Sequence, residues 1–312
     1  MNKEKKMIVC IGEALVDMIP RTLPSGDESY LPISGGAVFN TSIALSRLGS
    51  KAALLTGLSN DLFGQQIRES LLQSGVDPDL VVTSDRPTTL AFVKLINGSA
   101  QYSFFDENSA MRMLTLSDLG AFPKSAKALF MGGISLAIEP FGVACKEYLG
   151  ALDDDVPVMV DPNIRPTFIS DEKAYRKRLQ TIIVRSDIIK VSDEDLELME
   201  PGSNFEEIAK DWIEQGASLV LRTLGGDGAE AISATQSVKV NGVPVEVVDT
   251  VGAGDTFNAG LLHSLDTAGK LNHSNLKNLD DQDISTALSF ACRCAAHTVG
   301  QAGANPPWQK DL

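Results

Sequence analysis

Cysteine, aromatic side chains and positive charge are all scarce in this sequence. Aromatic residues make up 6% of the chain, and its 4 cysteines lack the regular spacing of a disulfide framework. Lysine and arginine total 27 against 41 aspartates and glutamates, which gives a net charge of −14. That balance argues against a nucleic acid or an anionic membrane as partner. The scattered cysteines are typical of a reducing cytoplasm, where we expect the protein to act.

Long apolar runs are absent as well. Residues 1–6 are polar and do not predict a signal peptide. No later run approaches the roughly 18 uninterrupted apolar residues that a membrane helix needs. Cys292, Cys294 and His297 fall in a helix-like stretch, where residues two apart point to different faces, so we expect no metal site there.

What the chain has instead is a regular alternation of strand-like and helix-like segments over 312 residues. Short apolar runs bounded by turn residues predict strands at residues 7–11, 52–57, 128–131, 156–160, 188–191 and 219–222. Amphipathic segments predict helices, among them residues 61–74, 171–184 and 204–215. The alternation predicts one α/β domain over residues 1–312, with a central mostly parallel β-sheet and helices on both faces.

Two regions break this alternation. Residues 88–94, Gly98 and residues 101–105 predict a β-hairpin, and residues 16–21 and 29–33 predict a second pair of extended segments. From these residues alone, a surface hairpin is the alternative to a separate small sheet.

The strongest functional signal is a turn of small residues, Gly252, Ala253 and Gly254, followed at once by Asp255. An amphipathic run from Phe257 onward predicts a helix directly after the turn. The first amides of a helix lack internal partners and carry the positive end of its dipole, so the turn is suited to bind an anion. The Asp255 carboxylate could then accept the proton of a hydroxyl that attacks a phosphoryl group. An ordinary turn with a capping aspartate is the alternative.

Two segments resemble a known family. Residues 249–255 resemble the C-terminal signature of the ribokinase-like (PfkB) carbohydrate kinases, and residues 35–40 followed by residues 46–49 resemble the N-terminal one. They occur in the expected order and separation, and the likeness runs from about Ile8 to Trp308. It implies a ribokinase-like fold that transfers the γ-phosphoryl of Mg-ATP to a sugar hydroxyl. Asp255 would be the general base, and the amides of the preceding turn would form the anion hole.

The resemblance also implies a small β-sheet lid over the sugar, made from discontinuous segments at about residues 14–33 and 88–106. In this family such a lid often forms a homodimer contact.

The resemblance extends to residues that would bind the sugar. Asp17 would accept hydrogen bonds from sugar hydroxyls, and Asn40 would bind another hydroxyl. Gly35 and Gly36 would let the backbone approach the sugar. Phe104, in a segment similar to a fructokinase pattern, is a further candidate. The alternatives are a solvated loop acid at Asp17 and a plain strand-to-helix turn at the glycines.

Residues that would meet the phosphates follow three predicted strands. Asn163 and Arg165 belong to an Asp-Pro-Asn-x-Arg segment, where the arginine would stabilise transferring charge or bind a substrate acid group; a surface salt bridge is the alternative. The remaining candidates for binding the nucleotide have three sources. A loop that matches the family's nucleotide pattern contains Thr223, Gly225, Gly226 and Gly228. The first turn of the Asp255 helix contributes Gly254, and the end of a third predicted strand contributes Ser192.

Metal candidates come from the resemblance alone. Asp195 stands near where relatives organise water around magnesium, although this chain has Ser192 and Asp195 in place of the usual asparagine and glutamate. A helix N-cap with acids in its first turn is the alternative. Asp249, Val251 and Gly303 are expected to hold a monovalent cation, with potassium as activator.

Several segments, around Thr89, Ser135 and Glu139, resemble the fructokinase branch, which implies D-fructose and its 6-hydroxyl. Asp106 and Glu107 replace an arginine of that branch, and like charge there would oppose a sugar acid. The alternatives are 2-keto-3-deoxygluconate kinase, ribokinase or nucleoside kinase, and, in a different class, a non-catalytic sugar-binding regulatory protein. A Rossmann oxidoreductase would need Gly-x-Gly-x-x-Gly after the first strand, where this chain has no such motif.

Overall fold

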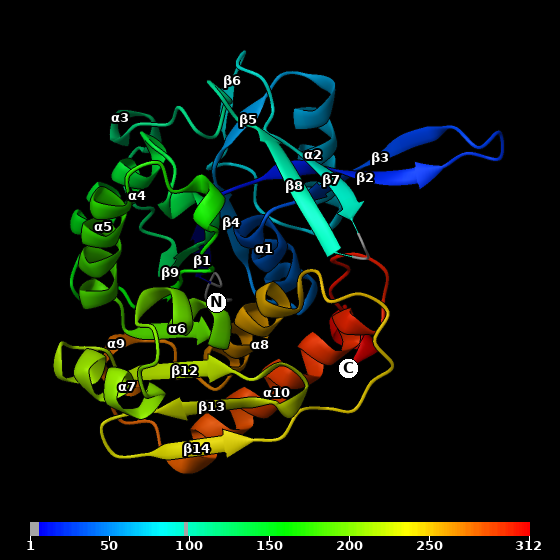
Figure 1. Ribbon diagram of the computed structural model, residues 1–312. Coiled ribbons are helices and arrows are strands. Elements are labelled where there is room, and N and C mark those ends of the chain that lie inside the picture. The colour runs from blue at the N-terminus through cyan, green and yellow to red at the C-terminus, as the bar shows by residue number, and fades with distance from the viewer. Residues whose placement is uncertain (1–5, 97–98) are drawn as a thin grey trace, which may run out of the picture.

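The computed structural model describes residues 6–96 and 99–312, and its centre is an 8-stranded sheet (Figure 1). In spatial order the strands are β14 (Ser237–Val240), β13 (Ala229–Ile232), β12 (Leu219–Thr223), β11 (Ile188–Ser192), β10 (Val158–Asp161), β9 (Ala126–Gly132), β1 (Met7–Ile11) and β4 (Ala52–Leu55). All pairs from β12 to β4 are parallel, whereas β12, β13 and β14 pair antiparallel. The predicted mostly parallel sheet is therefore confirmed.

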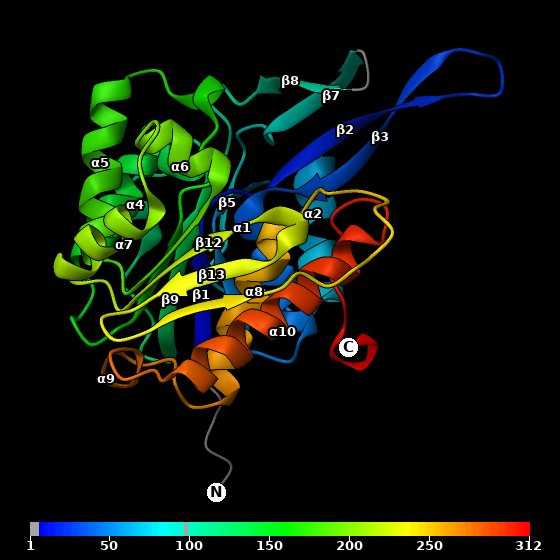
Figure 2. The same cartoon turned by 60° about the horizontal axis from the view of Figure 1, so that its bottom comes forward.

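Helices cover both faces of this sheet, as Figure 2 shows. One layer contains α1 (Ala37–Arg47), α2 (Leu62–Gln73), α8 (Ala253–Thr267) and α10 (Asp281–Val299). The other contains α3 (Leu116–Leu119), α4 (Phe141–Gly150), α5 (Glu172–Arg185) and α7 (Phe205–Glu214). Shorter elements complete the chain, namely α6 (Asp193–Met199), α9 (His273–Leu276) and the 3-10 helices η1 (Gly133–Leu136), η2 (Pro166–Phe168), η3 (Gly225–Asp227) and η4 (Gln309–Asp311).

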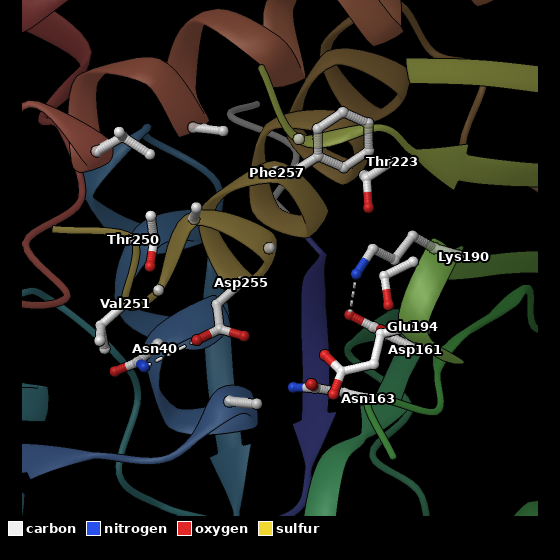
Figure 3. Close-up of a pocket in the computed structure, with 18 of the residues that line it drawn as sticks. Asn40, Asp161, Asn163, Lys190, Glu194, Thr223, Thr250, Val251, Asp255 and Phe257 are labelled. Carbon is white, nitrogen blue, oxygen red and sulfur yellow. Dashed lines mark hydrogen bonds and ion pairs between the residues drawn. The ribbon is translucent and has the colours of Figure 1, made fainter. Parts of the chain in front are cut away.

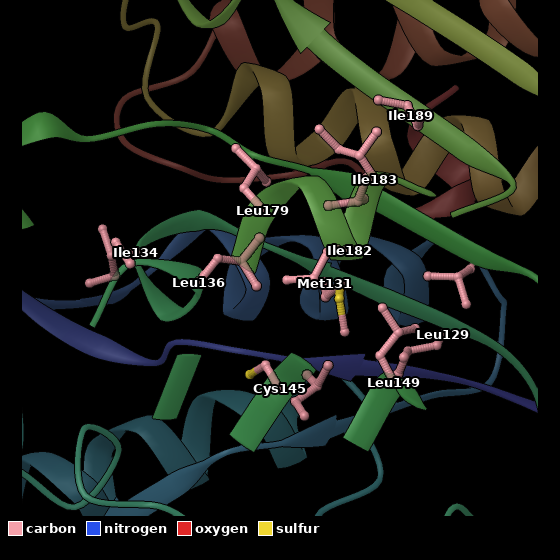
Figure 4. Close-up of a cluster of buried hydrophobic side chains, with 14 of the residues drawn as sticks. Leu129, Met131, Ile134, Leu136, Cys145, Leu149, Leu179, Ile182, Ile183 and Ile189 are labelled. Atoms are coloured by element: carbon pink, nitrogen blue, oxygen red, sulfur yellow. The ribbon is translucent and has the colours of Figure 1, made fainter. Parts of the chain in front are cut away.

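Two hydrophobic cores lie on the opposite faces of the sheet. Along β1, Val9 and Ile11 point into the core under α4 and α5, while Ile8 and Cys10 point into the core under α1 and α8. This alternation follows from the two-residue period of a strand, and burial of both sets explains the uninterrupted apolar run. Figure 4 shows the first core, to which α4 contributes Cys145 and Leu149 and α5 contributes Ile182.

A second, 4-stranded sheet stands apart from the central one. Its strands are β3 (Glu28–Gly35), β2 (Leu15–Thr22), β7 (Leu90–Ile96) and β8 (Ser99–Phe105), in that order. The β2–β3 hairpin projects away from the body of the molecule (Figures 1 and 2). Both predicted pairs of extended segments therefore join one sheet, and the predicted turn residue Gly98 lies outside the described residues.

Two details differ from the sequence-based expectations. The predicted strand at residues 52–57 is two strands, since β5 (Gly57–Ser59) turns away to pair with β6 (Val82–Ser84) in a separate two-stranded sheet. The antiparallel β13–β14 edge was not predicted. Within residues 6–96 and 99–312, none of the helices has the length and apolar character needed to cross a membrane.

Candidate active site

A cavity of about 1350 Å³ opens where the carboxyl ends of β10, β11 and β12 face the second sheet and α8. Ligands of open α/β sheets bind at this edge. Most of the predicted site residues line the cavity: Asp17, Gly36, Asn40, Phe104, Asn163, Arg165, Ser192, Asp195, Thr223, Gly225, Gly226, Gly228, Val251, Gly252, Ala253, Gly254 and Asp255. Gly35, Asp249 and Gly303 are not among its lining residues.

Asp255 lies in the first turn of α8, whose N-cap is Gly252. Gly252 has φ +78°, and a Cβ there would lie 2.6 Å from the Cβ of Ala304, so both the turn and its packing require glycine. Asn40 on α1 donates from Nδ2 to Asp255 Oδ2 at 2.8 Å (Figure 3).

The Asp255 carboxyl has the titration behaviour of a base that works near neutral pH. Burial raises the pKa of Asp255 to about 7, although the hydrogen bond from Asn40 lowers it, and the neighbouring Asp161 charge raises it further. A carboxylate with such a pKa holds an abstracted proton far better than an exposed aspartate does. Asn40, predicted to bind sugar, therefore also orients this carboxylate.

Asp17 and Gly35 form one unit in the second sheet, on its neighbouring strands β2 and β3. Asp17 lies on β2 opposite Ile33, and burial raises its pKa to about 6. A Cβ at Gly35 would lie 2.4 Å from Asp17 Oδ2. Gly35 therefore makes room for the Asp17 carboxylate rather than lining the cavity itself.

Glu13 is a buried carboxylate that the sequence analysis did not single out. Its Oε1 accepts from the Ala37 amide at 3.1 Å, and its Oε2 accepts from the Ser135 hydroxyl at 2.6 Å. Gly133 adopts φ +67°, and a Cβ there would lie 2.0 Å from Oε1. Glu13 thus joins the start of α1 to η1 in the cavity wall. The pair Gly12 and Glu13 directly after a buried strand was the signal in the sequence.

Glycines also shape the loop after β12. Gly228 has φ +104°, and a Cβ there would lie 2.2 Å from the carbonyl oxygen of Val240. Thr223, for which we predict a phosphate contact, lies at the end of β12 beside this loop and lines the cavity. Asn163 follows β10 with φ +40°, which is uncommon outside glycine and clusters at functional sites.

Asp195 is held by the protein at both carboxylate oxygens. Its Oδ2 accepts from the amide and hydroxyl of Ser192, at 3.0 and 2.7 Å, which forms a capping box at the start of α6. Its Oδ1 accepts from the Ile164 amide at 2.7 Å. The capping interpretation therefore holds for Ser192 and Asp195. Glu194, which lines the same cavity with an exposed side chain, is the freer carboxylate (Figure 3).

Lys190 and Asp161 form a buried ion pair that was also not predicted. Lys190 Nζ lies 2.9 Å from Asp161 Oδ2, which accepts a second hydrogen bond from Asn258 Nδ2 at 2.7 Å. Both members of the pair line the cavity. Burial by itself would lower the pKa of Lys190, but Asp161 and Asp195 outweigh it and hold that pKa above its usual value.

Arg165 lies exposed at the cavity wall. Its Nη1 donates to the carbonyl oxygen of Ile164 at 2.9 Å. The alternative of a surface salt bridge does not hold: within the described ranges, no carboxylate lies within ion-pair distance of Arg165.

Asp249 brings together the residues predicted to hold a monovalent cation. Its Oδ1 accepts from the Val251 amide and its Oδ2 from the Gly303 amide, each at 3.0 Å. The carbonyl oxygen of Val299 accepts from the Val248 and Asp249 amides at 3.0 and 3.1 Å. The loop before α8 and the loop after α10 are thereby fixed to each other.

One end of the cavity is apolar. The residues there come from the segment between β14 and α8 and from one side of α10, namely Val243, Val245, Val247, Cys292, Ala296 and Val299. Aliphatic walls of this kind suit a flat heterocyclic ring. The sequence analysis named none of these residues for this role.

Asp106 and Glu107 do not influence the cavity as expected. Asp106 is buried in an ion pair with Arg112, and neither acid is among the residues that line the cavity. The expectation that this pair opposes a sugar acid is therefore wrong, because both acids lie outside the cavity lining and Arg112 neutralises the charge of Asp106.

Comparisons with known proteins agree with this geometry. The sequence model of the pfkB family carbohydrate kinases matches residues 5–311. A fructokinase of Rhizobium leguminosarum bv. trifolii is 42% identical over 278 residues, which cover 89% of this chain and 85% of that protein.

Solved structures give the same result. The fructokinase of Xylella fastidiosa with bound ATP superposes with a TM-score of 0.88 at 26% identity, covering 96% of this chain and 94% of that one. A double mutant of the Vibrio cholerae O395 fructokinase, with fructose, ADP and a potassium ion bound, gives 0.84 at 27% identity, covering 97% and 95%. The family match over nearly the whole chain, on a fold with Asp255 buried at the cavity, shows that this protein belongs to the pfkB family of carbohydrate kinases.

Proposed function

We propose that this chain transfers the γ-phosphoryl group of ATP to the 6-hydroxyl of D-fructose, giving fructose 6-phosphate. The observation that carries the proposal is Asp255, a buried carboxylate with a pKa of about 7, at the start of α8 and at the wall of the large cavity. The 42% identity to a fructokinase over most of both chains supports fructose as the sugar.

In this proposal Asp255 accepts the proton of the sugar hydroxyl as the oxygen attacks phosphorus. Asn40 fixes the carboxylate through its 2.8 Å hydrogen bond, so the proton acceptor is already oriented. The amides of the turn at Gly252, Ala253 and Gly254 meet the charge on the transferring group, aided by the positive end of the 15-residue helix α8. Asp17 binds the sugar from the second sheet.

The nucleotide would lie along the other side of the cavity. Its base fits the apolar end around Val245 and Ala296, and its phosphates fit the loop at Thr223 and Gly228 and the Ser192 region. Magnesium fits as an ion carried by those phosphates and water, since Mg²⁺ is usually held by only one or two carboxylates. Glu194 is the residue that would hold it, with Asp195 fixed behind it in the capping box. The ion would neutralise phosphate charge.

A monovalent cation would sit between the two loops that Asp249 joins. The amides of Val251 and Gly303 donate to Asp249, which leaves carbonyl oxygens of these loops as ligands of the kind that potassium prefers. The Vibrio cholerae fructokinase structure with a bound potassium ion supports potassium as the cation. Arg165, beside the cavity, would swing from the Ile164 carbonyl toward transferring charge.

Charge in the cavity favours a neutral sugar over a sugar acid. Glu13, Asp17 and Asp255 line the side that faces the second sheet, and burial raises the pKa of each. A substrate carboxylate would add another desolvated negative charge beside them. This supports fructose over ketodeoxygluconate on grounds independent of Asp106 and Glu107.

A coupled assay of ADP release tests the proposal. Fructose, ribose, ketodeoxygluconate, tagatose and nucleosides are compared side by side, and ³¹P NMR of the product identifies the phosphorylated hydroxyl. We expect the highest kcat/KM for fructose. A higher value for the sugar acid would overturn the substrate assignment, and no transfer to any sugar would favour a regulatory sugar-binding protein.

We also propose that the chain is one kinase domain over residues 1–312, active in the cytoplasm as a homodimer through the lid, the sheet of β2, β3, β7 and β8. Phe92 makes edge contacts with Tyr30 and Phe105, with ring centroids 5.0 and 5.4 Å apart. Tyr30 and Phe105 are nevertheless 44% and 56% exposed. Light scattering after size-exclusion chromatography should give twice the monomer mass, and Tyr30→Glu should give the monomer; a monomeric wild type would refute the dimer.

A further inference from the structure

The position of Lys190 suits a role in the reaction as well as in the stability of the sheet. It lies on β11 and is 4% exposed, yet its ammonium group lies at the wall of the large cavity. A Cβ built on Gly254 would lie 3.4 Å from Lys190 Nζ, an ordinary contact distance. The ammonium group therefore borders the turn that precedes Asp255, and Figure 3 shows it across the cavity from that carboxylate.

The protein provides acceptors for only some of the hydrogen-bond donors of the Lys190 ammonium group. An ammonium group carries three donors. Among the described residues the one acceptor within hydrogen-bond distance is Asp161 Oδ2, at 2.9 Å. Asp161 in turn is held by Asn258 of α8, so the pair is fixed from two elements. A buried ammonium group with donors to spare, beside an anion-binding turn, is suited to contact an anion in the cavity.

We propose that Lys190 is a further catalytic residue, which donates a hydrogen bond to the γ-phosphoryl group while it moves from the nucleotide to the sugar. The proposal rests on the phosphoryl transfer proposed above. The bond from phosphorus to the leaving oxygen of ADP breaks as the bond to the sugar oxygen forms, and the sugar proton passes to Asp255. Lys190 keeps its own proton throughout and offsets the negative charge of the phosphoryl oxygens.

Asp161 has the complementary role of holding Lys190 in place. Its Oδ1 is buried without a hydrogen-bond partner among the described residues. Such an atom costs free energy, so stability alone does not account for the charged pair, and a second purpose does. A purely structural pair is the alternative, and it makes a different prediction: removing both charges together should leave catalysis intact.

The test therefore uses a single and a double variant. Lys190→Met keeps the length of the side chain but leaves Asp161 buried and unpaired, so we expect it to fold poorly. The double variant Asp161→Asn with Lys190→Met removes both charges and should regain stability in denaturant unfolding. Lys127→Met is the matched control, since Lys127 is ion-paired with Asp266 away from the cavity.

We expect the double variant to fold and to lose about 100-fold or more in kcat, the scale of one lost transition-state donor. Its fructose KM should stay within about threefold of the wild type, because the contact is to the phosphoryl group. Lys127→Met should keep the wild-type kcat. A double variant with kcat restored to within about threefold of the wild type would overturn the proposal.

A binding measurement separates this proposal from the proposed function. Calorimetry compares the affinity for a non-hydrolysable ATP analogue with the affinity for ADP, which lacks the γ-phosphoryl group. The affinity for the ATP analogue relative to that for ADP should fall about tenfold in the double variant, because one charged hydrogen bond to the γ-phosphoryl group is lost. An unchanged ratio overturns the role of Lys190. If the wild type phosphorylated no sugar, the proposed function would fail and this ratio would still decide the role of Lys190.

Discussion

The pH dependence of the reaction is the sharpest consequence of the buried Asp255. Its pKa is raised from 3.8 to about 7, and only the ionised carboxylate can accept the sugar proton. The kcat/KM of the wild type should therefore decrease about tenfold between pH 8 and pH 6. Asp17, with a pKa of about 6, should steepen the decrease only below that pH.

The same raised pKa predicts that stability depends on pH. The sign of this dependence is opposite to that of an ion-paired aspartate, whose pKa is lowered by folding. Between pH 4 and pH 7 the folded protein binds a proton at Asp255 that the unfolded chain releases, so stability decreases as the pH rises through this range. Asp255→Asn carries no charge and should not lose this stability. It should be more stable than the wild type at pH 8, by on the order of a few kcal/mol, and equally stable below about pH 4.

Two measurements check this reasoning. Steady-state kinetics from pH 5 to pH 9 should give an acidic limb near 7 in the wild type, and kcat of Asp255→Asn should be roughly 10²–10⁴-fold lower. Urea unfolding at pH 8 and pH 5 should show the stability gain of the variant shrinking at the lower pH. Calorimetry on the same variant should show retained binding of fructose and an ATP analogue. A limb below pH 5, or near-normal turnover in the folded variant, would refute the assignment of Asp255 as base.

Three further predictions concern the sugar and cation sites. Asp17→Ala should raise the fructose Kd roughly ten- to a hundredfold and leave ATP affinity unchanged, because we propose that its carboxylate binds the sugar and not the nucleotide; unchanged calorimetric affinity for fructose would leave Asp17 with a structural role on β2. Gly35→Ala should raise the fructose KM, since its Cβ would meet Asp17 Oδ2 at 2.4 Å, whereas Gly150→Ala, with no atom within 4 Å, should behave as wild type. Potassium should raise kcat above its value in sodium or lithium at equal ionic strength, and Asp249→Ala should abolish this difference; equal rates in all three salts would count against the cation site.

Most of the fold could be predicted because the strands carry local signals. The run at residues 7–11 is apolar at every position, and it becomes a central strand buried on both faces. The start of α2 was equally clear: Asp61 caps the helix by accepting from the Gly64 amide, and Gly75 after its end has φ +78°. The split of residues 52–57 could not be predicted, because Thr56 and Gly57 do not reveal that the chain leaves one sheet for another.

The residues of the candidate site likewise differ in how clearly the sequence reveals them. Gly252 and Asp255 could be found because a turn and the helix that follows it are encoded within a few residues. Glu13 follows a buried strand, which marks its place but not its role, and Lys190 has no such mark, since each depends on a partner far away in the chain, Ser135 and Asp161 respectively. A single acid or lysine in the sequence gives no indication of the distant group that pairs with it in the fold.

The two unpredicted groups explain how an acidic protein can handle phosphate. Glu13, Asp17 and Asp255 make one side of the cavity suitable for hydroxyl donors, and burial raises the pKa of all three. Phosphate needs hydrogen-bond donors and positive charge, which the opposite side supplies through backbone amides and Lys190. Asp161 keeps Lys190 charged. Because Asp255 lies where these two sides meet, one carboxylate can take a proton from a sugar held by acids while the charge it helps to create develops beside amides and an ammonium group.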